Sequence, residues 1–347
     1  MKIFKKGFRI LNLFYLCYNK YGDIMEQLFN KLNEIIKEYD NFIIVGHKNP
    51  DLDSIGSALG LYNVIKKFDK EAYIYVGKDE LSNYNESFNK SLKKLKDVNF
   101  IDSIKDINNT LVIVTDVHTQ NRVGCSELID KYDVVVLDHH IKDKNYIKNT
   151  KFMYIDSNLS SMSELITFYL EFLNIEIDVI TATIMLAGIE IDTNGFNLKT
   201  TSSTYEAASI LMEMGADTIL KQELLKETKE DYMKKASFIK NSFMVSSNIA
   251  MCIINETVTN IDLAEVAEEL LTFEEVQASY VIGKLDNSTI GISARSLGEI
   301  DVSLVMKELG GGGHITLAGA QVENMSIEEV KQLLIEKINE YFEEILG

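Results

Sequence analysis

Short apolar runs rich in β-branched residues alternate with stretches of helical periodicity through the first half of the chain. The runs that we predict to be strands are Phe42–Val45, Ala72–Val76, Leu111–Thr115, Val134–Leu137 and Phe152–Ile155. The stretches that we predict to be helices are Ile55–Phe68, Ser126–Lys131 and Ser163–Phe172. This alternation is typical of a parallel sheet with helices on both faces. We therefore predict an α/β fold built on a doubly wound, mainly parallel sheet.

The last hundred residues have a different pattern. Predicted strands and helices there are Val245–Ile254, Leu263–Leu271, Ala278–Leu285, Thr289–Ala294, Val302–Leu309, Gly319–Val322 and Ile327–Ile345. This order indicates a smaller, mixed α/β domain. Residues 204–243 are charged and helical in period, so we predict a helical connector there. The expected divisions are an extension over 1–24, a first domain over 25–203, the connector over 204–243 and a second domain over 244–347.

The charge balance excludes one class of function. The 347 residues include 53 acidic and 35 basic side chains, which gives a formal net charge of −18. A protein that binds long nucleic acid must neutralise many phosphates with a basic surface. We therefore expect no long nucleic acid as a partner.

The first twenty residues leave two interpretations open. Basic side chains up to Arg9 precede an apolar run over Ile10–Tyr18 that is too short to cross a bilayer. The segment could lie on an anionic membrane surface as a weak peripheral anchor, or it could be an extension that precedes the folded chain. No other segment resembles a transmembrane span. Three widely spaced cysteines indicate a reducing compartment, so we expect a cytoplasmic protein.

A polar turn follows the first predicted strand in the sequence VGHKNPDLDSIG. His47, Asp51 and Asp53 lie within seven residues there. One imidazole and two carboxylates suit a divalent cation of intermediate hardness. A simpler interpretation is that Asp53 or Ser54 caps the next helix, but it leaves His47 and Asp51 without a role.

Histidines and aspartates also follow the next buried strands and end the apolar helix predicted over 178–192. These residues are Asp116, His118, Asp138, His139, His140 and Asp192. Taken singly, an aspartate after a strand is often only a turn former. Parallel strands, however, end at one edge of their sheet, where ligands bind in open α/β folds. The sequence therefore predicts one site built from several strand ends.

Four aspartates in one crevice would repel one another strongly. Asp51, Asp53, Asp116 and Asp192 would together place four negative charges there, and such an arrangement needs compensating cations. Two divalent ions about 3.5–4 Å apart would neutralise it, and such a pair is the usual clamp for phosphoryl hydrolysis.

A further polar motif lies in the second domain. Arg295 is one of three arginines in the chain. It precedes four consecutive glycines that are followed by a histidine, which are Gly310, Gly311, Gly312, Gly313 and His314. Glycines let backbone amides approach an anion, and arginine binds phosphate through two parallel hydrogen bonds. The alternative is a flexible connection between strands. We predict a phosphate- or nucleotide-binding loop.

These motifs, in this order, resemble the DHH phosphoesterase superfamily, named for the triplet Asp138-His139-His140. The sequence GGGGHITLAGA resembles the DHH-associated C-terminal domain, and the likeness covers residues 40–345. GHKNPDLDSIGSA and AGIEIDTNGF are most similar to the catalytic module of GdpP-type cyclic di-AMP phosphodiesterases. The resemblance implies that 25–203 is the metal-binding catalytic domain and that 244–347 binds substrate.

The resemblance also implies roles for individual residues. Two Mn²⁺ ions would be bound. The ligands of the first would be His47, Asp51 and Asp116, and those of the second would be Asp53, Asp116, His139 and Asp192. Asp116 would bridge the ions, and His140 would face the scissile phosphate. The nucleotide would be bound by His118, Ser161, Arg295, Gly311, Gly312, Gly313 and His314.

The expected reaction is the opening of cyclic di-AMP to linear 5′-pApA by a hydroxide that the two cations activate. An alternative with the same metals is a hydrolase of very short oligonucleotides such as pApA. An alternative from another class is a nucleotide sensor without activity, but such a protein is expected to lose metal ligands, and all are present. A homodimer is compatible with the sequence.

Overall fold

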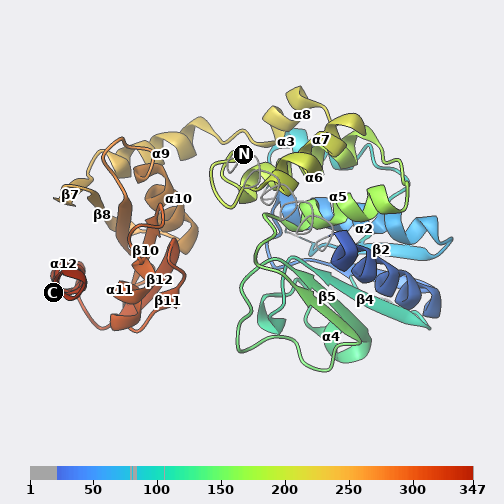
Figure 1. Ribbon diagram of the computed structural model, residues 1–347, viewed down its shortest axis with the longest axis horizontal. Helices are drawn as coiled ribbons and strands as arrows, with labels where there is room; N and C mark the ends of the chain where they lie inside the picture. The colour runs from blue at the N-terminus through green and yellow to red at the C-terminus, as the bar shows by residue number, and fades with distance from the viewer. Residues whose placement is uncertain (1–21, 79, 81–83, 105, 347) are drawn as a thin grey trace, which may run out of the picture. The chain divides into compact units, whose positions relative to one another are not determined.

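The structure is a computed structural model, and it describes residues 22–78, 80, 84–104 and 106–346. The chain forms two compact units that divide between Lys226 and Glu227 (Figure 1). Each unit has its own sheet and its own apolar core.

The sheet of the first unit has six parallel strands in the order β3-β2-β1-β4-β5-β6. The strands are β1 (Asn41–Val45), β2 (Glu71–Tyr75), β3 (Phe100–Ile101), β4 (Thr110–Thr115), β5 (Asp133–Asp138) and β6 (Phe152–Ile155). The strand order reverses at β1, since the chain runs outward through β2 and β3 and returns to pair β4 with β1. A reversal of this kind opens a crevice at the carboxyl ends of the two strands, which is where open α/β sheets bind ligands. The predicted fold class is confirmed.

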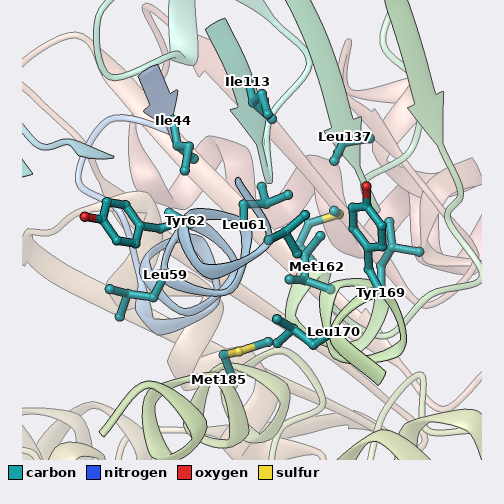
Figure 2. Packing of buried hydrophobic residues seen from close by; sticks show 14 of the residues in the cluster. Ile44, Leu59, Leu61, Tyr62, Ile113, Leu137, Met162, Tyr169, Leu170 and Met185 are labelled. Atoms are coloured by element: carbon teal, nitrogen blue, oxygen red, sulfur yellow. The ribbon is translucent and has the colours of Figure 1, made fainter. Parts of the chain in front are cut away.

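Helices cover both faces of this sheet. They are a helix over residues 22–38, α2 (Leu52–Lys67), α3 (Glu86–Leu92), α4 (Glu127–Lys131), α5 (Met162–Phe172), α6 (Val179–Asp192), α7 (Ser202–Glu213) and α8 (Thr218–Leu224). Alternate residues of the strands point to opposite faces. On one face Ile44, Ile113 and Leu137 pack toward helix side chains that include Leu61 and Met162 (Figure 2). Smaller β-branched side chains of the other face pack against the side of α4.

Close packing of α2 against α6 depends on a glycine. A Cβ added to Gly188 would lie 2.7 Å from the Cα of Asp53 and 3.0 Å from its backbone nitrogen. No side chain fits at that distance from a backbone. Gly188 therefore lets α6 lie directly on α2, which brings the end of α6 beside the start of α2.

The second unit has a mixed sheet in the order β11-β12-β10-β9-β8-β7. Its elements are α9 (Lys229–Ile239), β7 (Phe243–Ser246), β8 (Ile249–Thr257), α10 (Asn260–Leu270), β9 (Ala278–Lys284), β10 (Thr289–Ser296), α11 (Val302–Glu308), β11 (Gly312–Gly313), β12 (Leu317–Glu323) and α12 (Ile327–Leu346). Only β8 and β9 pair in parallel among these neighbours. The mixed α/β prediction is confirmed.

The single strand predicted over Val245–Ile254 is wrong. The structure has two antiparallel strands there, β7 and β8, joined by a turn at Ser247 and Asn248. The apolar residues on both sides of the turn read as one run, and the short polar pair was too weak a signal to divide it.

The segment 204–243 contributes to both units. Helices α7 and α8 pack on the core of the first unit through Ala207, Leu211 and Leu224, whereas Phe238 of α9 lies in the core of the second unit. A connecting role for the segment stays a prediction. Of the predicted extension over 1–24, residues 1–21 lie outside the described part of the chain. Among the residues that are described, no helix has the length and apolar character to cross a membrane.

Candidate metal centre

The ends of β1, β4 and β5 carry the polar residues that the sequence analysis identified, and the structure brings these residues together. Side chains from the loop after β1, the start of α2 and the end of α6 join them. Three groups in the described chain have ligand atoms within 4.8 Å of one another. The predicted ligands form two of them, which are His47, Asp51 and Asp116, and Asp53, Asp116, His139 and Asp192; the third joins Asp116 and His139 to His140. Asp116 belongs to all three groups. All six residues predicted as metal ligands therefore lie in one cluster.

The first group is arranged around the Nε2 atom of His47. This atom lies 3.4 Å from Asp51 Oδ2 and 3.3 Å from Asp116 Oδ2. The other ring nitrogen, Nδ1, lies 2.9 Å from the carbonyl oxygen of Lys48. When Nδ1 donates its hydrogen to that carbonyl, the neutral ring presents the lone pair of Nε2 to the carboxylates, as a metal-binding histidine requires.

The second group is arranged around the Nε2 atom of His139. It lies 3.1 Å from Asp192 Oδ2, 3.2 Å from Asp116 Oδ1 and 3.9 Å from Asp53 Oδ2. Yet His139 Nε2, Asp116 Oδ1 and Asp192 Oδ2 form no hydrogen bond within the described chain, although all three are buried. Buried polar atoms without partners are rare and costly.

These unpaired atoms fit a divalent cation. Octahedral ligands at bond lengths of about 2.1 Å stand about 3 Å from their neighbours, which is close to the separations of His139 Nε2 from Asp192 and Asp116. Imidazole and carboxylate together are a donor set for a transition-metal dication. The residues present therefore suit two cations that share Asp116.

Burial and crowding shift the pKa values of the cluster. Burial and the charge of Asp116 raise the pKa of Asp53 to about 6. Burial would lower the pKa of His47, but the carboxylates of Asp116 and Asp51 raise it to about 11. Burial likewise raises the pKa of Asp192 well above its usual range. Without a cation the cluster thus holds protons in place of positive charge, and metal binding must release them.

Backbone geometry fixes three of the carboxylates. Both oxygens of Asp53 accept hydrogen bonds of 2.7 Å from the backbone amides of Met162 and Ser163 at the start of α5. Asp51 caps α2 by accepting from the amides of Asp53 and Ser54, so the residue that caps this helix is also a candidate ligand. Asp116 has a φ of 61°, a strained value for a residue other than glycine.

Asp138 connects two histidines, a contact that the sequence analysis did not foresee. Its buried carboxylate accepts from Nδ1 of His118 and, at 2.8 Å, from Nδ1 of His140. These bonds and the nearby His140 hold the pKa of Asp138 well below its usual value, although burial opposes the shift. His140 is 41% exposed at its side chain. With Nδ1 bound to Asp138, the ring of His140 keeps Nε2 for a ligand.

Two residues predicted to bind substrate, His118 and Ser161, have hydrogen-bond partners within the first unit. His118 is buried, and its second ring nitrogen accepts from the backbone amide of Asp143 at 2.8 Å. Ser161 is fully buried and caps α5 by accepting from the amide of Glu164. Both side chains are buried and have partners within the first unit, and their role in binding substrate stays a prediction. In each case a short polar motif could not reveal its burial.

The predicted residues of the second unit have mixed surroundings. Arg295 is buried in β10, where Nε donates to Glu268 at 3.0 Å and Nη1 donates to Ser293 and Ala294. A Cβ on Gly311 or Gly313 would lie within 2.3 Å of a backbone oxygen of β12, so these glycines permit close strand pairing. Gly312 has open space beside it, and His314 is exposed. Binding of a nucleotide by Arg295, Gly311, Gly312, Gly313 and His314 stays a prediction.

Comparison with protein families finds two matches in the same order as the two units. Residues 41–189 match the N-terminal domain of the DHH family, and residues 245–344 match the DHHA1 domain.

Curated relatives and a solved structure agree with these matches. The chain is 37% identical over 325 residues to the cyclic-di-AMP phosphodiesterase GdpP of Bacillus subtilis (strain 168), covering 90% of this chain and 49% of GdpP. It thus spans about half the length of that relative. The bifunctional oligoribonuclease and PAP phosphatase NrnA of Mycoplasma genitalium is 27% identical over 333 residues, which cover 92% of this chain and 99% of NrnA. An exopolyphosphatase-related protein from Bacteroides fragilis shares the fold, with a TM-score of 0.73, 20% identity, and coverage of 91% of this chain and 96% of that chain.

Proposed function

Since the chain belongs to the DHH family of phosphoesterases, we propose that it is a phosphodiesterase that uses two divalent cations, Mn²⁺ by preference. The preferred substrate in this proposal is cyclic di-AMP, and the product is linear 5′-pApA. The similarity to GdpP over 90% of the chain supports this substrate. The observation that carries the proposal is the buried cluster around Asp116, whose unpaired ligand atoms need positive charge.

Cations bound at this cluster would supply Lewis acidity that activates a water molecule and withdraws charge from the phosphate. The chain positions those ligands rigidly. Asp53 is held by two backbone amides, and His47 is oriented by the carbonyl of Lys48. Such fixed ligands need no rearrangement when charge develops on the phosphate.

His140 is the residue proposed to handle the leaving group. In hydrolysis the oxygen of water bonds to phosphorus, the bond from phosphorus to the 3′ oxygen breaks, and that oxygen takes up a proton. His140 is half-exposed, and Asp138 holds its Nδ1 atom, so its Nε2 atom is oriented to donate that proton or to bind a phosphate oxygen.

A second candidate substrate has separate support. NrnA, an oligoribonuclease by its name, is similar to this chain over almost its entire length. The same cluster would act on pApA or another very short oligonucleotide and release mononucleotides. The net charge of −18 favours short substrates in both cases.

The deciding experiment compares three substrates with one preparation. The protein is incubated in Mn²⁺ with cyclic di-AMP, with pApA and with a 5-mer RNA, and the products are separated. We expect cyclic di-AMP to disappear fastest and pApA to accumulate. If pApA is consumed while cyclic di-AMP persists, the second candidate is correct. If no diester is cleaved, the proposed activity is wrong.

A matched pair of variants ties any turnover to the cluster. Asp51→Ala combined with Asp53→Ala removes one carboxylate from each ligand group. Asp102→Ala removes an exposed carboxylate elsewhere in the first unit. The double variant should lose metal-dependent turnover and Asp102→Ala should keep it. Full activity in the double variant would exclude these ligands.

A further inference from the structure

A pocket in the first unit is lined by residues other than the candidate metal ligands. Its volume is about 490 Å³, within the range of small-ligand sites. Among the residues that line it are Asn158, Phe196, Asn197, Lys199 and Tyr205. The roles described above use none of these residues.

The loop over 194–199 that forms one wall has an unusual backbone. Asn194, Gly195 and Phe196 have consecutive φ values of 46°, 68° and 64°. Positive φ is a genuine outlier for a bulky residue such as Phe196, and such strain gathers at ligand-binding sites. Thr193 holds the loop, since its hydroxyl accepts from the amide of Phe196 and its carbonyl accepts from the amide of Asn197. The loop is therefore held firmly in a strained conformation.

The strained loop places an aromatic pair in the pocket wall. The ring of Phe196 stacks on that of Tyr205 from α7, with centroids 5.5 Å apart and planes 14° from parallel. Phe196 packs on the core, whereas Tyr205 is 58% exposed. An exposed ring that stacks on a second ring packed against the core can serve as a platform on which a nucleobase stacks.

Polar groups around the platform match a base with an amino group. The amide nitrogens of Asn158 and Asn197 donate to Asp156 and to the carbonyl of Asn194. Their side-chain oxygens accept no hydrogen bond within the described chain, so they are free for an exocyclic amine such as that of adenine. Lys199 forms no ion pair with the described residues, and its ammonium group is available for a phosphate.

Both walls of the pocket are close in sequence to the metal cluster. Phe196 follows the candidate ligand Asp192 by four residues, and Asn158 precedes Met162, which holds Asp53, by four residues. Four residues span at most about 14 Å. A ligand with a phosphate at the cluster thus needs to extend only a short way to reach the aromatic platform.

We propose that this pocket is a nucleobase subsite that stacks an adenine on Tyr205 and binds its edge through Asn158 and Asn197. Lys199 contributes charge for an adjoining phosphate. The proposal rests on the proposed function, because it assigns the base-binding part of a substrate whose phosphodiester is cleaved at the cluster.

The test compares Tyr205→Ala with Tyr232→Ala, which removes a tyrosine of similar exposure, 60%, from α9. Each variant is assayed with cyclic di-AMP, with pApA and with bis(4-nitrophenyl) phosphate, a diester that has no base. Loss of one stacking platform should raise KM for the nucleotides by about 5- to 100-fold. The ratio of kcat/KM for nucleotide over kcat/KM for the baseless diester should fall accordingly. Tyr205→Phe should keep the wild-type ratio of nucleotide to baseless-diester kcat/KM, because it keeps the aromatic ring.

A second measurement needs no turnover. Saturation-transfer NMR with AMP on the metal-free protein should show contact to the adenine protons that weakens in Tyr205→Ala and persists in Tyr232→Ala. Equal losses on all three diesters, or unchanged ratios, would overturn the subsite while leaving the proposed activity intact. If wild-type protein cleaves no diester, the proposed function fails, and the NMR contrast alone then decides whether the pocket binds adenine.

Discussion

The cluster around Asp116 and the surroundings of Arg295 are both buried and charged, but their polar atoms are satisfied in opposite ways. Arg295 donates to Glu268, Ser293 and Ala294 through atoms of its own unit. In the cluster, His139 Nε2 and two carboxylate oxygens form no hydrogen bond within the described chain. Arg295 has hydrogen-bond partners within its own unit, whereas the Asp116 cluster contains buried polar atoms that lack them.

This difference separates two kinds of evidence for a site. Motif and resemblance drew equal attention to both regions, whereas packing gives the cluster a physical need for cations. Burying a charged group without a partner destabilises the folded state. A fold that keeps such a cluster must offset this destabilisation by binding an ion of opposite charge. Arg295 carries no such need, because its Nε and Nη1 atoms already have partners, and its role in binding a nucleotide stays a prediction. The predictions below test this contrast, from the largest expected effect to the smallest.

Removing the shared ligand should have the largest effect. Asp116→Asn takes a charge from both ligand groups, so we expect turnover in Mn²⁺ to fall by more than about 100-fold, beyond the loss typical of residues behind the ligands. Steady-state kinetics measure the change, with Asp102→Asn as the exposed control. Retention of a tenth of the wild-type activity would contradict the shared-ligand role.

Removing the carboxylate behind His140 should have a smaller effect. Asp138→Asn keeps the side-chain shape but weakens the bonds to His118 and His140. We expect kcat to fall by about 10- to 100-fold while bound Mn²⁺, measured by elemental analysis, stays at the wild-type level. Loss of metal together with activity would show that Asp138 supports the ligands rather than His140.

Closing the space at Gly188 should separate α6 from α2. Gly188→Ala places a Cβ 2.7 Å from the backbone of Asp53, and overpacking of this kind costs about 1–3 kcal/mol of unfolding free energy. Denaturant unfolding measures that cost. Gly22→Ala is the control, because a Cβ there meets nothing. Equal stability of the two variants would mean that the helices move apart freely.

Changing Arg295 should have the smallest effect on catalysis. Arg295→Lys cannot keep all three hydrogen bonds, so we expect a loss of about 1 kcal/mol in unfolding free energy. If the guanidinium group of Arg295 binds substrate, KM rises by about 5-fold at nearly constant kcat, as expected for the loss of about 1 kcal/mol of binding. Glu268→Gln, which weakens the same ion pair, is the matched control. A fall in the amount of metal bound by Arg295→Lys would contradict the claim that Arg295 and the metal cluster have separate roles.

The parts that sequence could predict were those set by local pattern. Alternating strands and helices predicted the parallel sheet. Polar residues that follow strands predicted most of the cluster, because parallel strands end at one edge, and the carboxylate that ends an apolar helix predicted Asp192. The link from His118 through Asp138 to His140 was not predictable, since it depends on side-chain direction within a loop. The close approach at Gly188 was missed for a similar reason, because nothing in a helical pattern shows which neighbour touches a glycine.

The burial of individual side chains was also not predictable from the sequence. Ser161 and His118 stand in polar motifs yet are enclosed, while the long apolar face of the helix over 22–38 went unassigned and packs into the core through Leu28 and Ile35. The glycine run had two competing interpretations, and the structure gives Gly311 and Gly313 a packing role without testing ligand binding. Contacts between distant segments decide such cases, and a single sequence does not record them.

Metal titration at several pH values tests the central claim most directly. Isothermal titration of metal-free protein with Mn²⁺ should give two ions per chain and a release of protons, since the raised pKa of His47, about 11, means that a cation must displace a proton there. Affinity should therefore rise with pH, about tenfold per unit for each proton displaced, and Asp116→Asn should lose both ions. Binding that is weak, independent of pH and unchanged in Asp116→Asn would contradict the account.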